Sequence, residues 1–196
     1  MANTIMKDRG IPDIVINNAG AGRWLSVEET SSAEVEQMMA APYFAAFNLT
    51  REFLPHMLKR GSGQIVNISS VASRIVWPGA AAYTAARWAI NGFSKALRSE
   101  LYGSGVKVTL AIFGNVSSTF WVHNPGSKER LPKIDRLIPT LTPERTAQAI
   151  VHGIEKNSRE IIRPGIFRFI FLLNALFPRT TEMVMRIGWR RAPQNR

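Results

Sequence analysis

Residues 61–87, GSGQIVNISSVASRIVWPGAAAYTAAR, predict a strand, a loop and the beginning of a helix. The apolar run 64–68 lies between glycines and a pair of serines, which is typical of a short buried strand. A proline–glycine pair breaks the following loop, and an alanine-rich run then starts a helix over residues 82–102. Because open parallel sheets bind ligands beyond the carboxyl ends of their strands, the serines and the first helical turn are expected to border a site.

Two residues of the predicted helix, Tyr83 and Arg87, are four positions apart. This spacing places their side chains on one face of a helix. A fixed positive charge beside a phenol makes the phenolic proton easier to move. Ser70, at the end of the strand, brings a hydroxyl group to the same region. The stretch therefore predicts a site for binding an oxygen atom and transferring a proton.

Short apolar runs predict three more strands, at residues 12–16, 106–113 and 160–163. The run 12–16 is continuous, so that strand is expected to be buried on both faces. Helical periodicity covers residues 31–60, where Pro42 predicts a kink or two abutting helices. Because strands alternate with helices, the sequence indicates an α/β fold with a parallel sheet and right-handed crossovers.

The long segment 114–141 is interrupted by glycines and prolines. A connection of this length is usually functional or mobile. Thr142 and Pro143 then provide the capping residue and first-turn proline of a helix that is expected to reach about residue 157. Residues 1–10 are expected to be the end of a helix that stops at Gly10.

Length and composition indicate one globular domain. The 196 residues are 45% hydrophobic and 20% charged, which is sufficient for a substantial core. The sequence has no cysteine and no secretory signal, so a cytoplasmic location is expected, either free or peripheral at a membrane. The three histidines are far apart and lack metal-ligand spacing, so no metal site is expected.

The net charge of +11 is concentrated near the carboxyl terminus, where residues 159–196 contain eight arginines and two glutamates. No zinc-finger, basic-zipper or RNA-recognition signature accompanies this charge, so nucleic acid is not an expected partner. Residues 166–177 are apolar nearly all round but too few to span a bilayer. Packing on the domain or a partner subunit and contact with an anionic membrane surface both remain open. We divide the chain into a domain, 1–163, and a basic, apolar helical tail, 164–196.

Several separated motifs together resemble the short-chain dehydrogenase/reductase family. NNAG at 17–20 follows the first strand, and Ser70 precedes Tyr83 by thirteen residues. Tyr83 also begins a Tyr-x-x-x-basic pattern that ends at Arg87. Residues 113–118, FGNVSS, resemble the Pro-Gly-x-Val-x-Thr pattern of the family. The resemblance extends over roughly residues 5–165.

This resemblance implies a Rossmann-type, three-layer α/β fold and hydride transfer between NAD or NADP and a small carbonyl or alcohol substrate. Tyr83 would act as general acid/base, Ser70 would bind the reacting oxygen, and Arg87 would support the phenol electrostatically. The residues implied to bind the cofactor are Asn18, Ala19, Gly20, Tyr83, Arg87, Gly114, Val116 and Ser118. Segment 119–141 would cover the substrate, and helix 82–102 would join subunits of a homo-oligomer.

The chain also departs from the family pattern. It lacks the glycine-rich phosphate loop, so it is expected to begin near the end of the family's third helix, without the first strands of the sheet. Arg87 stands where the family has lysine and, unlike lysine, cannot relay a proton. Pro42 stands where the family has an asparagine that often anchors a relay water. The alternative interpretation is a non-catalytic scaffold of this family that binds a partner or an anionic membrane surface.

Overall fold

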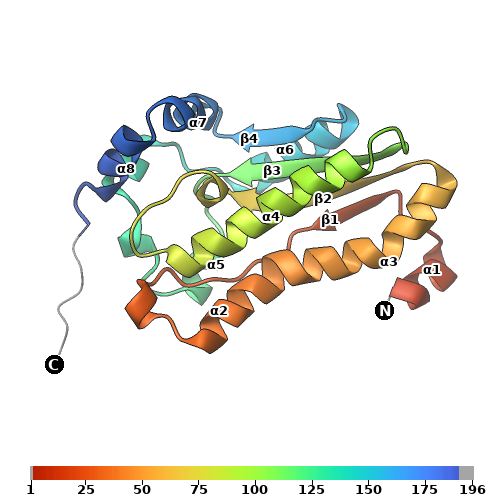
Figure 1. Ribbon diagram of the computed structural model, residues 1–196, viewed down its shortest axis with the longest axis horizontal. Coiled ribbons are helices and arrows are strands. Elements are labelled where there is room, and N and C mark those ends of the chain that lie inside the picture. Colours follow the sequence, from red (N-terminus) through yellow and green to blue (C-terminus); the bar gives the residue numbers. More distant parts are fainter. Residues whose placement is uncertain (1, 190–196) are drawn as a thin grey trace.

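The computed structural model describes residues 2–189, and its centre is a parallel sheet of four strands (Figure 1). Among the described residues the strands follow one another across the sheet in chain order. All three strand pairings are parallel, which confirms the predicted Rossmann-type α/β fold. The strands are β1 (Ile14–Asn17), β2 (Gly63–Ser70), β3 (Val106–Phe113) and β4 (Glu160–Arg163).

Alternate residues of β3 face two different helical layers, as the period of two in a strand requires. Leu110 and Ile112 pack with the side of the sheet covered by α4 (Ala81–Glu100). Ala111 and Phe113 pack on the opposite side, against α6 (Pro143–Glu155). The chain therefore has helix, sheet and helix layers, with β3 buried on both faces.

The first strand differs from this pattern. Val15 is buried in the core on the side of α3 (Ala45–Arg60), but Ile14 and Ile16 are 43% and 46% exposed. The prediction of a strand buried on both faces is wrong at this position, because the helix on that side of the sheet, α6, packs mainly on β3 and β4. An apolar run alone does not show how far a covering helix extends.

The predicted break at Pro42 is confirmed. The helix α2 (Ser32–Met39) begins at Ser31, which forms a capping box with Glu34. A wide π-turn, Ala40–Phe44, then leads directly into α3. Proline has no backbone N–H to donate to an i−4 carbonyl, which explains the widened turn at this point. Gly61 ends α3 in the left-handed conformation, with φ of +71°.

The remaining helices are α1 (Ala2–Arg9), α5 (Phe120–His123), α7 (Ile166–Leu176) and α8 (Pro178–Arg186). Short 3₁₀ turns occupy Val27–Glu29, Val71–Ser73, Lys128–Arg130 and Lys133–Leu137. Phe167 of α7 and Met185 of α8 join the main core cluster at the carboxyl end of the sheet. No helix between residues 2 and 189 is long and apolar enough to cross a bilayer. The division between 1–163 and 164–196 stays a prediction, and residues 190–196 lie outside the described part of the chain.

The helix α4 has no single apolar face available for a subunit contact. Ile90 and Leu97 are buried in the core, whereas Trp88 is 49% exposed and lies on the opposite side of the helix. Oligomerisation through helix 82–102 stays a prediction, and Trp88, not Ile90 or Leu97, would take part in it.

Candidate active site

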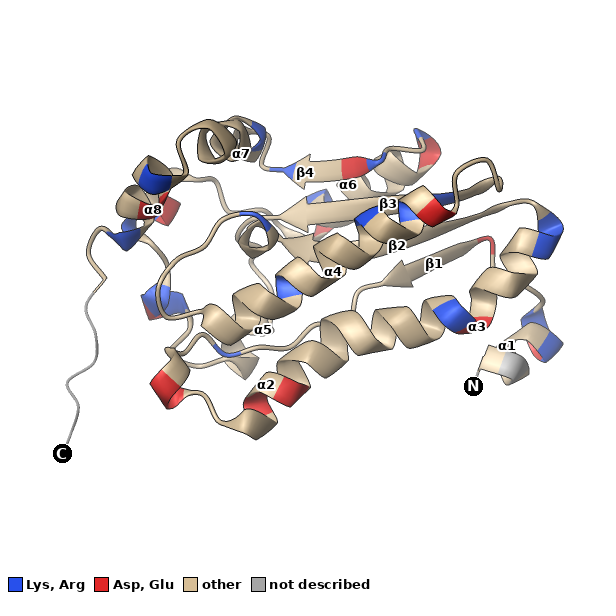
Figure 2. Cartoon of the chain, in the orientation of Figure 1, with Lys and Arg blue, Asp and Glu red and all other residues tan. Residues whose placement is uncertain are grey.

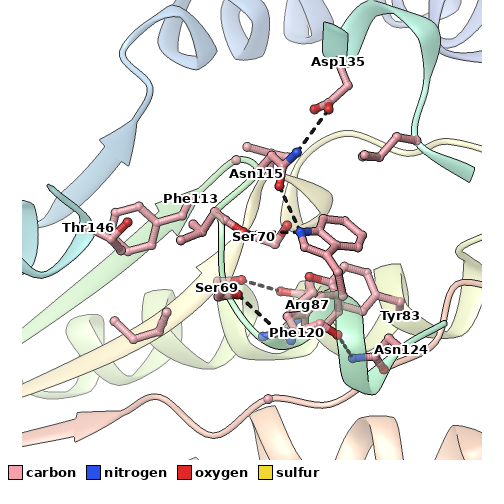
Figure 3. A pocket seen from close by; sticks show the side chains of 18 of the residues that line it. Ser69, Ser70, Tyr83, Arg87, Phe113, Asn115, Phe120, Asn124, Asp135 and Thr146 are labelled. Atoms are coloured by element: carbon pink, nitrogen blue, oxygen red, sulfur yellow. Dashed lines mark hydrogen bonds between the residues drawn. The ribbon is translucent and has the colours of Figure 1, made fainter. Parts of the chain in front are cut away.

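A cavity of about 720 Å³ lies where β1, β2 and β3 end and α4 begins (Figure 3). Its position follows from the topology, because parallel strands place all their carboxyl ends at one edge of the sheet. Ala19 is the one predicted site residue that is not on the cavity wall; its side chain is exposed. The others all line the cavity: Asn18, Gly20, Ser70, Tyr83, Arg87, Gly114, Val116 and Ser118.

Tyr83 and Arg87 lie on one side of α4, as their spacing predicted. Both are 6% exposed, and the Arg87 guanidinium carbon lies 4.7 Å from the centre of the Tyr83 ring. This is a cation–π contact, in which the face of the aromatic ring attracts the positively charged guanidinium. The Tyr83 hydroxyl has no hydrogen-bond partner among residues 2–189, so it is free to bond a ligand.

The Arg87 guanidinium also packs against the backbone of Gly20. A Cβ atom at Gly20 would lie 2.8 Å from Arg87 Nη2, so a larger residue at this position would require the guanidinium to shift. The buried Arg87 Nε atom has no hydrogen-bond partner within the described chain. A buried donor of a charged group normally has a partner. The wall of the cavity therefore holds a guanidinium with unused hydrogen-bonding capacity.

The two serines at the end of β2 have different partners. Ser70 Oγ accepts a hydrogen bond from the backbone N–H of Ala72 at 3.3 Å, which leaves its own proton available for donation. Ser69 Oγ donates to the carbonyl oxygen of Arg87 at 3.4 Å and so connects β2 to α4. Ser70 is the predicted ligand-binding serine, while the positioning contact of Ser69 was not foreseen.

A buried chain of amide hydrogen bonds lies behind the site. Asn17 Nδ2 donates to Asn67 Oδ1 at 2.7 Å, and Asn67 Nδ2 donates to Ser94 Oγ at 2.8 Å. Ser94 in turn donates to the carbonyl oxygen of Ile90 at 2.7 Å. These bonds join β1, β2 and α4, the elements that carry the NNAG motif, Ser70 and Tyr83. Sequence analysis missed this set; its only signal was Asn67, a polar residue within the apolar strand.

The segment 119–141 forms one side of the cavity, where Asn115 links two of its side chains (Figure 3). Trp121 Nε1 donates to Asn115 Oδ1 at 3.2 Å and also to the carbonyl oxygen of Val116 at 3.3 Å. Asn115 Nδ2 donates to Asp135 Oδ2 at 3.5 Å. Burial raises the pKa of the Asp135 carboxyl, and the hydrogen bond from Asn115 opposes this effect. Asp135 was not among the predicted site residues.

The substitution Asp135→Asn is expected to raise the thermal midpoint by about 2 °C at neutral pH. The folded-state pKa of Asp135 is higher than its unfolded value, so the folded protein retains a proton that the unfolded chain releases. Stability is then lost as pH rises from 3.8 through the raised folded pKa, and asparagine avoids this loss. Calorimetry at neutral pH and below pH 3.8 checks this expectation.

The gain in thermal midpoint should disappear at the lower pH, where the wild-type Asp135 carboxyl is protonated in both the folded and the unfolded protein. Asp8→Asn, at an exposed aspartate, is the matched control and should show the same midpoint shift at both pH values. An equal gain for Asp135→Asn at both pH values would contradict an electrostatic origin.

The rest of the cavity wall is mainly aromatic and aliphatic. The Trp24 ring lies 5.5 Å from the Tyr83 ring, 5.2 Å from the Trp77 ring and 5.4 Å from the Trp121 ring, measured between centroids. Phe120 adds a ring 6.2 Å from Tyr83. Further apolar lining residues are Ile75, Leu131, Ile134, Ile138, Phe167 and Met185. Ser70 and Tyr83 thus present their hydroxyl groups beside an apolar compartment.

No group of three or more metal-binding side chains is assembled within residues 2–189. The side chains lining the cavity that can take part in chemistry include the hydroxyl groups of Ser70 and Tyr83, the buried guanidinium of Arg87 and the carboxyl group of Asp135. These can bind an oxygen atom and transfer a proton, but none of them can supply or accept a hydride.

Comparison with known proteins gives a consistent result. A sequence profile described as short chain dehydrogenase matches residues 1–130. Estradiol 17-beta-dehydrogenase 11 of Rattus norvegicus is 30% identical over 177 residues, which cover 89% of this chain and 56% of that protein. Fatty acyl-CoA reductase of Acinetobacter baylyi is 30% identical over 197 residues, covering 100% of this chain and 64% of the relative.

Among solved structures, a short-chain dehydrogenase from Sphingobium yanoikuyae in complex with NADPH superimposes with a TM-score of 0.74. It is 21% identical, and the match covers 97% of this chain and 71% of the other. Likeness at this identity indicates a shared fold. The chain spans less than two thirds of the length of the two curated relatives.

Proposed function

The chain belongs to the short-chain dehydrogenase family, and we propose that it transfers a hydride between NAD or NADP and an apolar carbonyl or alcohol substrate. One observation supports this function above the others. Ser70, Tyr83 and Arg87, which lie on β2 and α4, line the same cavity at the carboxyl edge of the sheet. The names of the two curated relatives, a dehydrogenase and a reductase, support the same class of reaction.

A nicotinamide cofactor, when bound, supplies or accepts the hydride that no side chain of the cavity can provide. Arg87 would hold its ribose, because the guanidinium is buried beside the NNAG motif and its Nε lacks a protein partner. Asn18 and Gly20 would border the same end, and Gly114, Val116 and Ser118 would border the nicotinamide ring. The NADPH in the Sphingobium yanoikuyae structure supports this class of cofactor, and both NAD and NADP remain candidates.

Tyr83 would move the proton. In the reducing direction its hydroxyl donates a proton to the carbonyl oxygen, and in the oxidising direction the phenolate takes the proton from the alcohol. Ser70 would orient that oxygen with the hydroxyl proton that its contact with Ala72 leaves free. Arg87 remains protonated throughout, so it supports the phenolate by its charge and does not relay a proton. Pro42 provides no side-chain hydrogen bond for a relay.

The substrate would be large and mostly apolar. Four rings, those of Trp24, Trp77, Phe120 and Trp121, surround the compartment next to Tyr83. Such a wall binds alkyl or fused-ring groups by burial of apolar surface and offers few partners to a polar molecule. The relatives' names refer to a steroid and to fatty acyl groups, and both substrate types have this character.

The test is reduction of carbonyl compounds by the purified chain with NADH and with NADPH, followed by loss of cofactor absorbance. A long-chain aldehyde and its short-chain analogue form the matched pair, since they differ only in apolar surface. The long-chain aldehyde is expected to have at least a tenfold higher kcat/KM, because each buried methylene contributes about 0.8 kcal/mol. Lack of reduction with every carbonyl compound by a folded protein would refute the function. Equal kcat/KM for the two aldehydes would refute the substrate class alone.

A further inference from the structure

The outward face of α7 is apolar, although this helix lies on the surface of the domain. Phe169, Leu172 and Leu176 are spaced three and four residues apart and are 56%, 55% and 62% exposed. On the opposite side of the helix, Phe167 is buried in the core. A helix on the surface of a water-soluble domain normally turns charged and polar residues outward. In α7 the only charged residue is Arg168, which is exposed.

The neighbouring helix α8 is outwardly basic. Arg179, Met183 and Arg186 are exposed and recur every three to four residues, whereas Thr181 and Met185 are buried. Figure 2 shows α7 tan over most of its length and α8 with blue bands beside it. Arg186 is paired with Glu182 at 3.0 Å, while Arg168 and Arg179 have no ion pair within residues 2–189. The two helices thus combine an exposed apolar stripe with unpaired positive charge.

We propose that α7 and α8 form a membrane-contact surface that binds an anionic lipid bilayer in the plane of its interface. The apolar stripe Phe169, Leu172 and Leu176 would enter the boundary between headgroups and acyl chains. Arg168 and Arg179 would bind lipid phosphates, each contributing through the negative surface potential. Both helices are too short to cross the bilayer, so the contact is peripheral.

The charge pattern favours a lipid surface over a second copy of the chain. In a two-fold contact both copies would bring the same surface to the interface, including Arg168 and Arg179, which have no ion pair within residues 2–189. Like charges that face each other in an interface oppose association. Anionic lipids attract the same arginines, and they match both parts of the surface, the apolar stripe and its positive charge.

The membrane-contact surface adjoins the cavity. Phe167 and Met185, on the inward sides of the two helices, line the cavity wall. The outward sides of α7 and α8 would therefore bind the bilayer, while their inward sides border the apolar compartment of the cavity. Lipid binding is nevertheless separable from catalysis, because it requires neither cofactor nor turnover.

Vesicle flotation of the whole chain tests the proposal. Binding is expected to vesicles of phosphatidylcholine mixed with phosphatidylserine and to be much weaker with phosphatidylcholine alone. The double variant Arg168→Gln/Arg179→Gln should lower partition into the anionic vesicles about 30-fold, at about 1 kcal/mol for each arginine. Phe169→Ser/Leu172→Ser should lower it at least about tenfold, by removing exposed apolar groups without disturbing the core.

Matched controls remove comparable groups elsewhere on the surface. Arg51→Gln/Arg145→Gln deletes two exposed arginines on α3 and α6, and Trp88→Ser/Val151→Ser deletes two exposed apolar side chains. Both controls should float like the wild type. Equal flotation with neutral vesicles, or equal loss in controls and test variants, would overturn the proposal. A second result would also overturn the proposal: the chain does not float with vesicles, and light scattering shows a dimer that the Phe169→Ser/Leu172→Ser variant no longer forms.

Discussion

Replacement of Tyr83 by phenylalanine is expected to lower kcat about 10³-fold, because a general acid/base typically contributes 10²- to 10⁴-fold. The variant removes only the hydroxyl group. The ring keeps its contacts with Trp24 at 5.5 Å, Phe120 at 6.2 Å and the Arg87 guanidinium at 4.7 Å. The phenolic oxygen has no hydrogen bond within the described chain that its loss would break. KM and the thermal midpoint should therefore change little.

The measurement is steady-state reduction of the long-chain aldehyde by wild type and variant. Tyr102→Phe is the matched control, since it deletes a hydroxyl group from a tyrosine that is 90% exposed. The control should keep wild-type kcat. A Tyr83→Phe variant with near-normal kcat would show that another group transfers the proton.

The largest expected effect on stability comes from Gly105→Ala. Gly105 has φ of +84°, and a Cβ atom there would lie 1.9 Å from the carbonyl oxygen of Gly61. An L-residue in this conformation costs about 1–2 kcal/mol, and displacing the Gly61 backbone adds about 1–3 kcal/mol. A total loss of about 2–5 kcal/mol is expected in the free energy of unfolding, measured by urea denaturation. Gly105 immediately precedes β3 and Gly61 lies two residues before β2, so the contact joins the beginnings of two paired strands.

The chain provides a control two residues away. Gly103 has φ of +79°, but a Cβ atom there would meet nothing within 4 Å. Gly103→Ala should therefore show only the conformational part, about 1–2 kcal/mol. The difference between the two variants isolates the steric effect of the Gly61 carbonyl. Equal losses would mean that the turn can move away from Gly61 at no measurable cost.

Local patterns predicted the secondary structure closely where an element is bounded by strong signals. The apolar runs 106–113 and 160–163 coincide with β3 and β4, because glycines and a proline delimit them. The π-turn at Pro42 follows from the absent N–H group of that residue, and the helix start at Thr142 follows from its cap. These features depend on interactions between residues that are only a few positions apart, so the local sequence is sufficient to predict them.

The candidate site was predicted for a different reason. Ser70 lies at the end of one parallel strand, and Tyr83 and Arg87 lie one turn apart on the next helix. Once the sheet is parallel, these positions meet at its carboxyl edge. The same topology brings Gly114 and Val116 to the cavity from the end of β3. The motif residues could therefore be placed without coordinates, while the separation between their atoms could not.

Contacts between distant segments were the part that sequence analysis missed. Asn67 bonds Asn17 and Ser94, which are fifty and twenty-seven residues away. Asp135 is buried against Asn115, twenty residues before it. Nothing in the local sequence of these residues specifies the partner. A polar residue in an apolar strand or a carboxylate in a proline-rich loop can be recognised in the sequence. Its hydrogen-bond partner cannot.

The sequence by itself determined the family, the parallel α/β fold and the motif residues that border the cavity, except Ala19, because each depends on local periodicity or on motif spacing. The tertiary structure decided which faces are covered. It leaves Ile14, Ile16 and Trp88 exposed and places Phe167 and Met185 on the cavity wall. It also places the Arg87 guanidinium against Gly20 and the Tyr83 ring. Burial is a property of the whole assembly of helices on the sheet, so it cannot be read from any one segment.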